Sequence, residues 1–311
     1  MTPDVSIVIL TYRRKDSVLA LLNDLQRITD PGVEIIVVDN GSDDGTTEAV
    51  AAAHPETLLI SQPDNTGVGA RNRGMERAAG NIIVTLDDDM LDLDNDDIAH
   101  LRRRFSESQD LAGLCFKVTW PGTDRVRDWV HRPPPSEAGA CFDTYEITEG
   151  AVAYRTEALR VVGMYREDLF ISHEGLDLSY RLWDSGWRIE YDGCIAVGHA
   201  HAAGGRKSWR RYYYDTRNLL WVSLLHQPAR YAVPYLIRGL AAMAVYSLRD
   251  GFFLTWMRAV RDGLLGLPLI LRERRPWSPS THRAISEMDS RRPPFLELAR
   301  RRLTQKDFSL E

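Results

Sequence analysis

The sequence predicts an α/β protein with a doubly wound, mostly parallel sheet and an amphipathic helical extension at its C-terminal end. Short apolar, β-branched runs alternate with helix-like segments over the first hundred residues. Such runs are typical of strands buried on both faces of a parallel sheet. The last third instead carries apolar residues at helical spacing with basic residues between them, which indicates amphipathic helices.

The first three elements follow from residue spacing. Residues 5–10 form an almost continuous apolar run and are expected to be the first strand. Residues 17–28 repeat apolar side chains at helical spacing, and Pro31-Gly32 ends that helix. Residues 34–38 form a second apolar run, followed by the turn-forming cluster at 39–42.

The next elements continue the alternation. The cluster at 39–42 can cap a helix over 46–53. A strand at 58–61, a helix at 69–79 and a strand at 81–86 complete a β-α-β-α-β-α-β order. This order predicts a doubly wound sheet, in which ligands bind at the carboxyl ends of the strands.

Composition limits the class of protein. A length of 311 residues allows one large domain, or one domain with an appendage. The three cysteines are far apart and form no CxxC pair, which argues against a disulfide framework or a zinc knuckle and fits a reducing cytosol. The N-terminus has its basic residues after its apolar stretch, which is the wrong order for a secretory signal.

Charge is distributed unevenly along the chain. Residues 1–205 carry a net charge of −16, whereas residues 206–311 carry +11. Because the basic part is also rich in Trp, Leu and Tyr, we expect it to meet an anionic membrane surface and not nucleic acid.

Polar clusters fall at the predicted carboxyl ends of four strands. They are Thr11-Tyr12-Arg13, Asp39-Asn40-Gly41-Ser42, Asn65-Thr66-Gly67 and Asp87-Asp88-Asp89. Three adjacent carboxylates repel one another unless a cation or hydrogen-bond donors lie close by. The acidic run is therefore either a solvated turn or part of a metal site. If the strand continued through it, Asp87 and Asp89 would point the same way and Asp88 the opposite way.

The ordered motifs resemble the family 2 glycosyltransferases with the Rossmann-like GT-A fold. The similarity is carried by VSIVILTYRR, VVDNGSDDGT, NTGVGARNRG, TLDDD, EGAVAYRTEALRVVGMYREDLF, HEGLDLSYRLWDSGWRI, VGHAHAAGG and YYYDTRNLLW, and it covers about residues 4–227. The resemblance implies an inverting, metal-dependent transfer of a sugar from a nucleotide-diphosphate sugar, with UDP or dTDP preferred over GDP.

The resemblance also implies a metal site. Asp89 is expected to bind Mg²⁺ or Mn²⁺ at the diphosphate, with Asp87 near the ribose or the metal. His199 or His201 could complete the ligands, and His199 fits the family spacing better. A hydrogen-bonded loop histidine is the competing interpretation of His199.

Further residues are expected to bind the nucleotide sugar. Asp39 could accept the imino N–H of a uracil or thymine, with Thr11 on the same base, although Asp39 could instead form a helix cap or an Asx-turn. Arg71 could hold the base or a phosphate. The remaining members of the expected donor site are Tyr12, Arg13, Asn65, Gly67 and Asp88.

The general base is harder to assign. Family members usually carry two adjacent acids in the motif that here reads HEGLDLSYR, and the second is commonly the base. In this chain Gly175 occupies that second position. We therefore assign the role to Glu174, with His173 and Asp177 as alternatives. Asp177 and Arg181 are four residues apart and favour a structural ion pair on one helical face.

The expected domain division places the catalytic domain at 1–227, with a donor half at about 1–100 and an acceptor half at about 101–227. Residues 228–275 should form two amphipathic helices broken near Gly251, and 276–311 a partly ordered basic tail. Because the longest uncharged segment there has ten residues, we expect helices lying in the membrane interface, with a packed or dimer-forming pair as the alternative.

These expectations describe a cytoplasmic enzyme attached peripherally to the inner face of the cell membrane. Its acceptor would be lipid-linked or hydrophobic and used in cell-envelope glycan assembly. Two other functions compete: a sugar-1-phosphate nucleotidyltransferase, which should carry a Gly-rich loop after the first strand, and a catalytically idle nucleotide-binding subunit of a glycan assembly complex. A homodimer is compatible with any of them.

Overall fold

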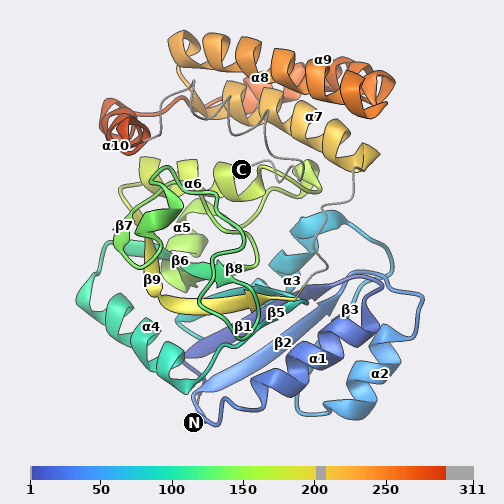
Figure 1. The fold of residues 1–311 in the computed structure, drawn as a ribbon, viewed down its shortest axis with the longest axis vertical. Helices are drawn as coiled ribbons and strands as arrows, with labels where there is room; N and C mark the ends of the chain where they lie inside the picture. The colour runs from blue at the N-terminus through green and yellow to red at the C-terminus, as the bar shows by residue number, and fades with distance from the viewer. Residues whose placement is uncertain (1, 201–207, 292–311) are drawn as a thin grey trace.

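A mixed sheet forms the centre of the molecule in the computed structural model, which describes residues 2–200 and 208–291 (Figure 1). Its strand order is β3-β2-β1-β4-β8-β6-β9-β5, with β7 paired to β9. The strands are β1 Val5–Thr11, β2 Val33–Asp39, β3 Leu58–Ser61, β4 Ile82–Asp87, β5 Met90–Leu91, β6 Leu111–Thr119, β7 Cys141–Asp143, β8 Ala151–Arg155 and β9 Arg188–His199. The first four in this order are parallel, as predicted, and β8 then runs antiparallel to both β4 and β6.

Helices cover both faces of the sheet. The helices up to β9 are α1 Lys15–Leu25, α2 Thr46–Ala53, α3 Arg71–Arg77, α4 Asn95–Glu107, α5 Thr156–Val162 and α6 Glu174–Asp184. Leu21 of α1 and Leu101 of α4 are buried in one core cluster with Ile7. Met75 of α3 and Leu178 of α6 belong to the cluster on the opposite face. The result is a three-layer α/β/α arrangement, because each helix buries one apolar stripe against the sheet.

The helix expected at 69–79 is divided. A 3₁₀ helix, η1 Gly67–Ala70, leads into α3, which ends at Arg77. Ala78 is extended, and the N–H of Ala79 donates to the carboxylate of Glu34 at 2.7 Å. The helix therefore ends early. The N–H of Ala79 is satisfied by Glu34 of β2 instead of by a helix carbonyl, and the chain then enters β4 directly.

Four helices lie beyond α6, on one side of the sheet (Figure 1). They are α7 Trp209–His226, α8 Ala229–Asp250, α9 Phe253–Glu273 and α10 Pro279–Ser290. The break between α8 and α9 falls at Gly251, which adopts φ +83°, a conformation that glycine tolerates at the end of a helix. Leu219 and Leu220 of α7 pack with Leu236 of α8, and Ile285 of α10 packs against Tyr180 of α6.

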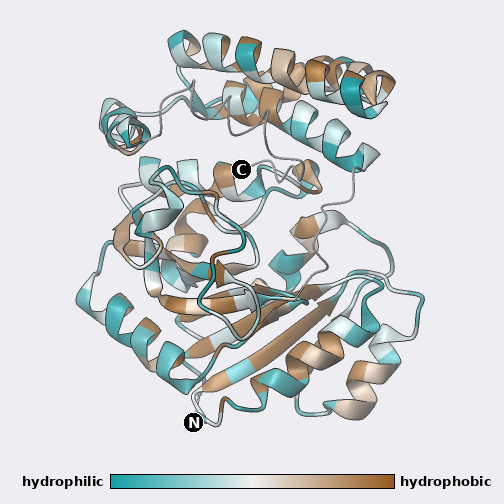
Figure 2. Cartoon of the chain, in the orientation of Figure 1, coloured by the Kyte–Doolittle hydropathy of each residue, from teal (hydrophilic) through white to brown (hydrophobic). Residues whose placement is uncertain are grey.

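α8 and α9 expose many large apolar side chains, and Figure 2 shows hydrophobic colour along both helices as well as in the sheet. The exposed set is Val233, Ile237, Val245, Leu248, Leu254, Met257, Leu264, Leu265, Leu269 and Leu271; we call it the apolar face. Leu254 and Leu265 are 80% and 72% exposed. By length and composition alone, α8 also meets the requirement for crossing a membrane, a test that core helices pass as well.

Candidate active site

The acidic run does not continue the strand. β4 ends at Asp87, and Asp88 and Asp89 lie in a turn. The predicted alternation of the three carboxylates is therefore wrong. Asp88 and Asp89 share one partner, because Nη1 of Arg14 lies 2.8 Å from Oδ1 of Asp88 and Nη2 lies 2.6 Å from Oδ2 of Asp89. Asp87 instead accepts a hydrogen bond from Nη2 of Arg71 at 2.5 Å.

Strand register brings Asp89 and His199 together. β5 pairs antiparallel with β9, so that Met90 is opposite His199, and the N–H of Ala200 donates to the carbonyl of Asp89 at 2.8 Å. Nε2 of His199 lies 3.3 Å from Oδ1 of Asp89. Its other nitrogen, Nδ1, lies 2.6 Å from Oδ2 of Asp128. The imidazole is thus held between two carboxylates.

The electrostatics of this group are strongly coupled. Burial alone lowers the pKa of His199, but hydrogen bonds and charges from Asp128 and Asp89 outweigh burial and raise it to about 9. Burial alone raises the pKa of Asp89, but His199 and Arg14 outweigh it and lower the value to about 2. Burial raises the pKa of Asp88 to about 7 despite Arg14. A protonated His199 must lose its proton before its nitrogen can bind a cation.

The donor atoms fit a divalent cation. Asp89 offers a carboxylate and His199 an imidazole, and Asp128 behind the histidine is the kind of outer partner that fixes the orientation of a metal-binding imidazole. Asp87 does not share these partners, because its carboxylate forms an ion pair with Arg71. His201, the alternative to His199, lies outside the described residues.

The loops after β1 and β2 contribute further predicted donor residues. The Oγ1 of Thr11 donates to Oδ2 of Asp88 at 2.8 Å. Arg13, which follows Tyr12, has φ +53° and pairs with Asp43 on the surface. Thr11 is therefore part of the buried site, whereas Arg13 lies at its exposed edge.

Asp39 is held by hydrogen bonds within its own loop and the helix that follows. Its Oδ1 accepts the N–H of Ser42, three residues on, at 3.0 Å, and its Oδ2 accepts the hydroxyl of Thr47. The side chain is fully buried. An Asx-turn would bond the N–H two residues on, so the observed turn is one residue wider than the alternative interpretation expected.

Asn65 and Gly67 are held in a compact loop after β3. The Oδ1 of Asn65 accepts from the N–H of Gly67 at 2.9 Å and from the side chain of Asn40 at 3.1 Å. The next N–H, from Val68, donates to the carbonyl of Phe170 at 2.7 Å. The donor-side loop is therefore tied to the segment that precedes α6.

That segment is strained and clamped. Phe170, Ser172 and His173 have φ of +64°, +74° and +67°, values that cost free energy in non-glycine residues. Nδ2 of the buried Asn218, on α7, donates to the carbonyls of Leu169, Ile171 and Ser172 at 2.7 to 2.9 Å. α7 therefore holds the strained segment in place.

The three candidate bases sit differently. Glu174 is buried at the start of α6, and burial raises its pKa to about 7. His173 is partly exposed, and desolvation lowers its pKa. Asp177 pairs with Arg181 at 2.7 Å, as the spacing predicts, and also with Nε2 of His226 at 2.7 Å. Because both oxygens of Asp177 are engaged, its contacts are those of a structural ion pair.

A cavity of about 900 Å³ lies between the catalytic part and the C-terminal helices. Aromatic rings form part of its wall: Tyr145, Tyr180, Tyr214, Tyr231, Tyr235, Tyr246 and Trp277. Arg132, Arg210, Arg211 and Arg238 line it together with the carboxylates of Glu146, Glu149, Asp215 and Asp289. Arg132 pairs with Glu146 and Asp289, and Arg211 with Asp215. The cavity, which His173 also lines, thus offers aromatic surface and charged side chains of both signs.

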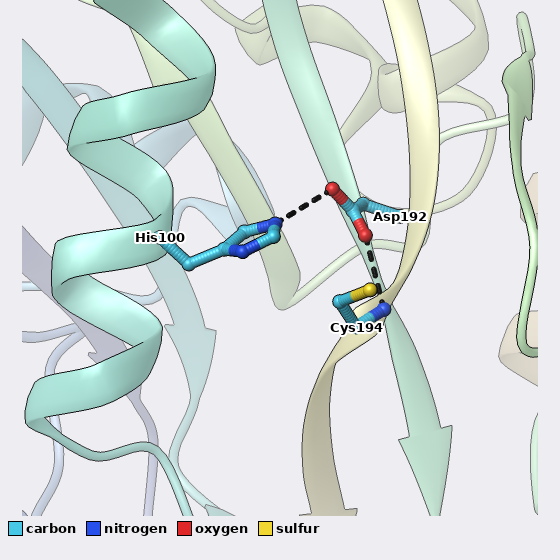
Figure 3. Close-up of side chains that lie close together, drawn as sticks. All are labelled: His100, Asp192 and Cys194. Atoms are coloured by element: carbon cyan, nitrogen blue, oxygen red, sulfur yellow. Dashed lines mark hydrogen bonds and ion pairs between the residues drawn. The ribbon is translucent and has the colours of Figure 1, made fainter.

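A second cluster of metal-type side chains lies elsewhere in the fold. His100 of α4 faces Asp192 and Cys194 of β9 (Figure 3). Asp192 accepts from Nε2 of His100 at 2.9 Å, from Nη1 of Arg104 at 2.5 Å and from the N–H of Cys194 at 3.0 Å. Since a guanidinium and an imidazole already neutralise this carboxylate, the cluster is explained as the ion pair that attaches α4 to the sheet.

Solved structures of other proteins share the fold described above. The fold is that of the GT-A glycosyltransferases. TarS from S. aureus, residues 1–349, matches with a TM-score of 0.60 at 19% identity over 99% of this chain and 94% of that one. A mannosyltransferase from Pyrobaculum calidifontis, solved with GDP-mannose and Mn²⁺, matches with a TM-score of 0.54 at 19% identity over 99% and 89%.

The chain belongs to glycosyl transferase family 2, whose model matches residues 6–161. The succinoglycan biosynthesis protein ExoO from Rhizobium meliloti is 36% identical over 119 residues, which is 37% of this chain and 32% of ExoO. The alignments span about a third of the length of three curated relatives, AglE, EpsH and ExoO. The family match covers residues 6–161, which include the loops after β1, β2, β3 and β4.

Several residues of the site were not predicted. Arg14, Asp128 and Glu149 carry no motif of their own, although Arg14 stands in the quoted VSIVILTYRR and Glu149 in EGAVAYR. Asn218 stands in YYYDTRNLLW. One signal could have identified Arg14: it is a basic residue just after the end of one predicted strand, and an acidic run follows the end of another.

Proposed function

We propose that this chain is an inverting, metal-dependent glycosyltransferase. It moves a sugar from a UDP- or dTDP-sugar to a hydroxyl group of a lipid-linked or hydrophobic acceptor in cell-envelope glycan biosynthesis. The observation that carries the proposal is the convergence of Asp89 and His199 beyond the carboxyl end of β4, close to the donor-side loops. Membership of glycosyl transferase family 2 supports the class of reaction.

The donor would lie across the loops after β1, β2, β3 and β4. In this proposal Asp89 and His199 hold Mg²⁺ or Mn²⁺, Thr11 and Asp39 face the base, and Arg71 faces a phosphate or the base. A divalent cation bound there supplies positive charge that stabilises the diphosphate leaving group. The nucleotide-sugar class is supported by solved relatives of the fold, since TarS has been solved with UDP and with UDP-GlcNAc.

The acceptor would occupy the aromatic cavity. Its hydroxyl oxygen attacks the anomeric carbon from the face opposite the nucleotide, and a carboxylate that lines the cavity takes the proton. Aromatic walls suit sugar rings or apolar chains. Arg210 and Arg238 suit a phosphate group, whereas Arg132 and Arg211 pair with carboxylates of the same cavity.

Peripheral attachment to the inner face of the cell membrane is part of the proposal. α8 and α9 carry many exposed large apolar side chains, and the exposed basic residues Arg258 and Arg261 lie between Leu254 and Leu265 on α9. A homodimer formed through the apolar face is the alternative.

Calorimetric titration tests the donor assignment. The protein is titrated with UDP, dTDP and GDP, each with and without Mn²⁺. Mn²⁺-dependent binding of UDP or dTDP is the expected result. Binding of no nucleotide would contradict the proposal, and nucleotide binding without any sugar transfer or donor hydrolysis would favour the idle subunit. Formation of a nucleotide sugar from a sugar 1-phosphate would favour the nucleotidyltransferase.

A further inference from the structure

Gly175 leaves a space that another residue fills. A Cβ built on Gly175 would overlap the carboxylate of Glu149, and it would also lie 3.2 Å from Cβ of Ile147. The backbone of Gly175 hydrogen bonds to the same carboxylate. Glu149 therefore occupies the volume in which the side chain of an acidic residue at position 175 would begin. The rest of this inference depends on the proposed function.

Glu149 is also next to the donor side of the site. It precedes Gly150, whose carbonyl accepts the N–H of Asp87 at 3.1 Å. A Cβ on Gly150 would overlap the carboxylate of Asp87, so the two segments are in direct contact. Gly150 has φ +70°, which glycine adopts without strain. Glu149 is thus adjacent in sequence to Gly150, the residue that contacts Asp87 at the end of β4.

The cavity distinguishes Glu149 from Glu174. Glu149 lines the 900 Å³ cavity, whereas Glu174 is not among the residues that line it. Glu146 lines it too, but pairs with Arg132 at 2.9 Å. His173 lines the cavity as well, but its Nδ1 is 2.8 Å from the hydroxyl of Ser172 and desolvation lowers its pKa. Of Glu149 and Glu174, only Glu149 meets a molecule that enters the cavity.

The surroundings of Glu149 suit proton transfer. Burial and the negative charge of Glu174 raise its pKa well above the usual value, and Arg71 opposes them. Within the described residues, Oε2 of Glu149 is buried without a hydrogen-bond partner, and so is Oε2 of Glu174. A buried oxygen with no partner is costly, and such a cost is typical of groups that are kept for a catalytic role.

We propose that Glu149 is the general base, and that it takes the place of the acid that Gly175 lacks. As the acceptor oxygen bonds to the anomeric carbon, the bond from that carbon to the diphosphate oxygen breaks and its electron pair leaves with the nucleoside diphosphate. The proton of the acceptor hydroxyl passes to the carboxylate of Glu149. Glu174 is a positioning residue, whose charge favours proton uptake by Glu149.

The test measures donor hydrolysis, in which water replaces the acceptor, and Mn²⁺-dependent nucleotide binding in the same proteins. The donors are UDP-glucose, UDP-galactose, UDP-N-acetylglucosamine and dTDP-rhamnose. The variants are Glu149→Gln, Glu149→Ala, Glu174→Gln and His173→Asn, with Glu157→Gln on the exposed face of α5 as the control. A double variant, Glu149→Ala with Gly175→Asp, moves the acid to position 175.

We expect Glu149→Gln to keep nucleotide affinity within about two-fold and to lower kcat about 10²- to 10⁴-fold, the usual contribution of a general base. The kcat of Glu174→Gln should fall less than that of Glu149→Gln, and the kcat of Glu157→Gln should not change. The double variant should have a kcat at least about ten-fold higher than that of Glu149→Ala. A merely structural role of Glu149 would not produce this recovery.

The assignment is overturned if Glu149→Gln keeps its kcat, or if Glu174→Gln or His173→Asn loses more than Glu149→Gln. Failure of the double variant to regain activity, with nucleotide binding intact, also counts against it. If the unmodified protein binds no nucleotide, the proposed function fails instead, and the binding titration reveals this separately.

Discussion

Nη2 of Arg14 lies 2.6 Å from Oδ2 of Asp89, across 75 positions of sequence. The same guanidinium reaches Asp88, so one side chain from the loop after β1 neutralises two buried carboxylates after β4. Arg14 is about a third exposed, at 35%. It therefore stabilises the acidic turn while its side chain keeps access to solvent.

Arg14→Gln should destabilise the protein, and Mn²⁺ should restore part of the loss. Without Arg14 the two carboxylates repel each other, at a cost of about 1–2 kcal/mol, less than for a fully buried pair because solvent screens Arg14. A cation bound to Asp89 replaces the missing charge, so Mn²⁺ should raise the unfolding temperature of this variant more than that of the unmodified protein. Arg13→Gln, which removes an exposed ion pair, is the control. An equal effect of Mn²⁺ on both variants would contradict the assignment.

Asp89→Asn should abolish turnover and the Mn²⁺-dependent part of nucleotide binding. An amide is a much weaker ligand for a hard cation than a carboxylate. Donor hydrolysis and calorimetry measure the two effects, and Asp96→Asn, an exposed residue of the same acidic region, is the control. Full activity of the Asp89 variant would rule out the metal site.

Glu174→Gln should stabilise the folded protein above pH 7. The folded-state pKa of Glu174 is raised to about 7 by burial, so the folded state holds its proton more tightly than the unfolded state does. The contribution of protonated Glu174 to the free energy of unfolding is present at acidic pH and is lost as pH rises from about 4.5 to 7. At 1.36 kcal/mol per pKa unit the gain on substitution is at most about 3 kcal/mol. Urea unfolding at pH 5 and pH 8 should show a larger gain at pH 8; equal gains would contradict the raised pKa.

Asn218→Ala should loosen the segment before α6. Three carbonyls lose their donor, which we expect to cost about 2–4 kcal/mol. Hydrogen exchange of residues 169–173 should rise, and kcat should fall because Glu174 and Gly175 follow directly. Asn95→Ala removes exposed side-chain hydrogen bonds and serves as the control. Unchanged exchange at 169–173 would show that α7 does not clamp the segment.

Two charges on the apolar face should prevent membrane binding. The double variant Leu254→Glu with Leu265→Glu changes exposed side chains and leaves the core intact. We expect the unmodified protein to sediment with vesicles containing about 30% phosphatidylglycerol and the double variant to stay in solution. Val161→Glu, on α5 and 65% exposed, is the control. Equal sedimentation of all three proteins would contradict attachment through this face.

The parallel part of the fold could be predicted from sequence because its strands are buried on both faces. β1 and β2 appear as almost continuous apolar runs, and turn clusters mark the carboxyl ends of both strands. The break at Gly251 was predictable too, since glycine and a flanking charge end α8. In each case the determining interaction is local in sequence.

The contacts of the site were less predictable because they are not local. Arg14 meets Asp89 through β1–β4 pairing, and His199 meets Asp89 through β5–β9 pairing. The geometry of Asp87 to Asp89 depends on a turn that interrupts the strand period. Glu149 was missed because its role depends on the absence of a side chain at Gly175, which no single motif reveals.

The pairing of β5 with β9 has a consequence for biosynthesis. Asp89 leaves the ribosome early, but its partner His199 follows more than a hundred residues later, at the end of β9. A nascent chain that has completed β4 therefore displays the acidic turn without the imidazole. The proposed cation site can therefore assemble only after β9 has been synthesised, and a chain truncated before β9 would lack the imidazole that completes it.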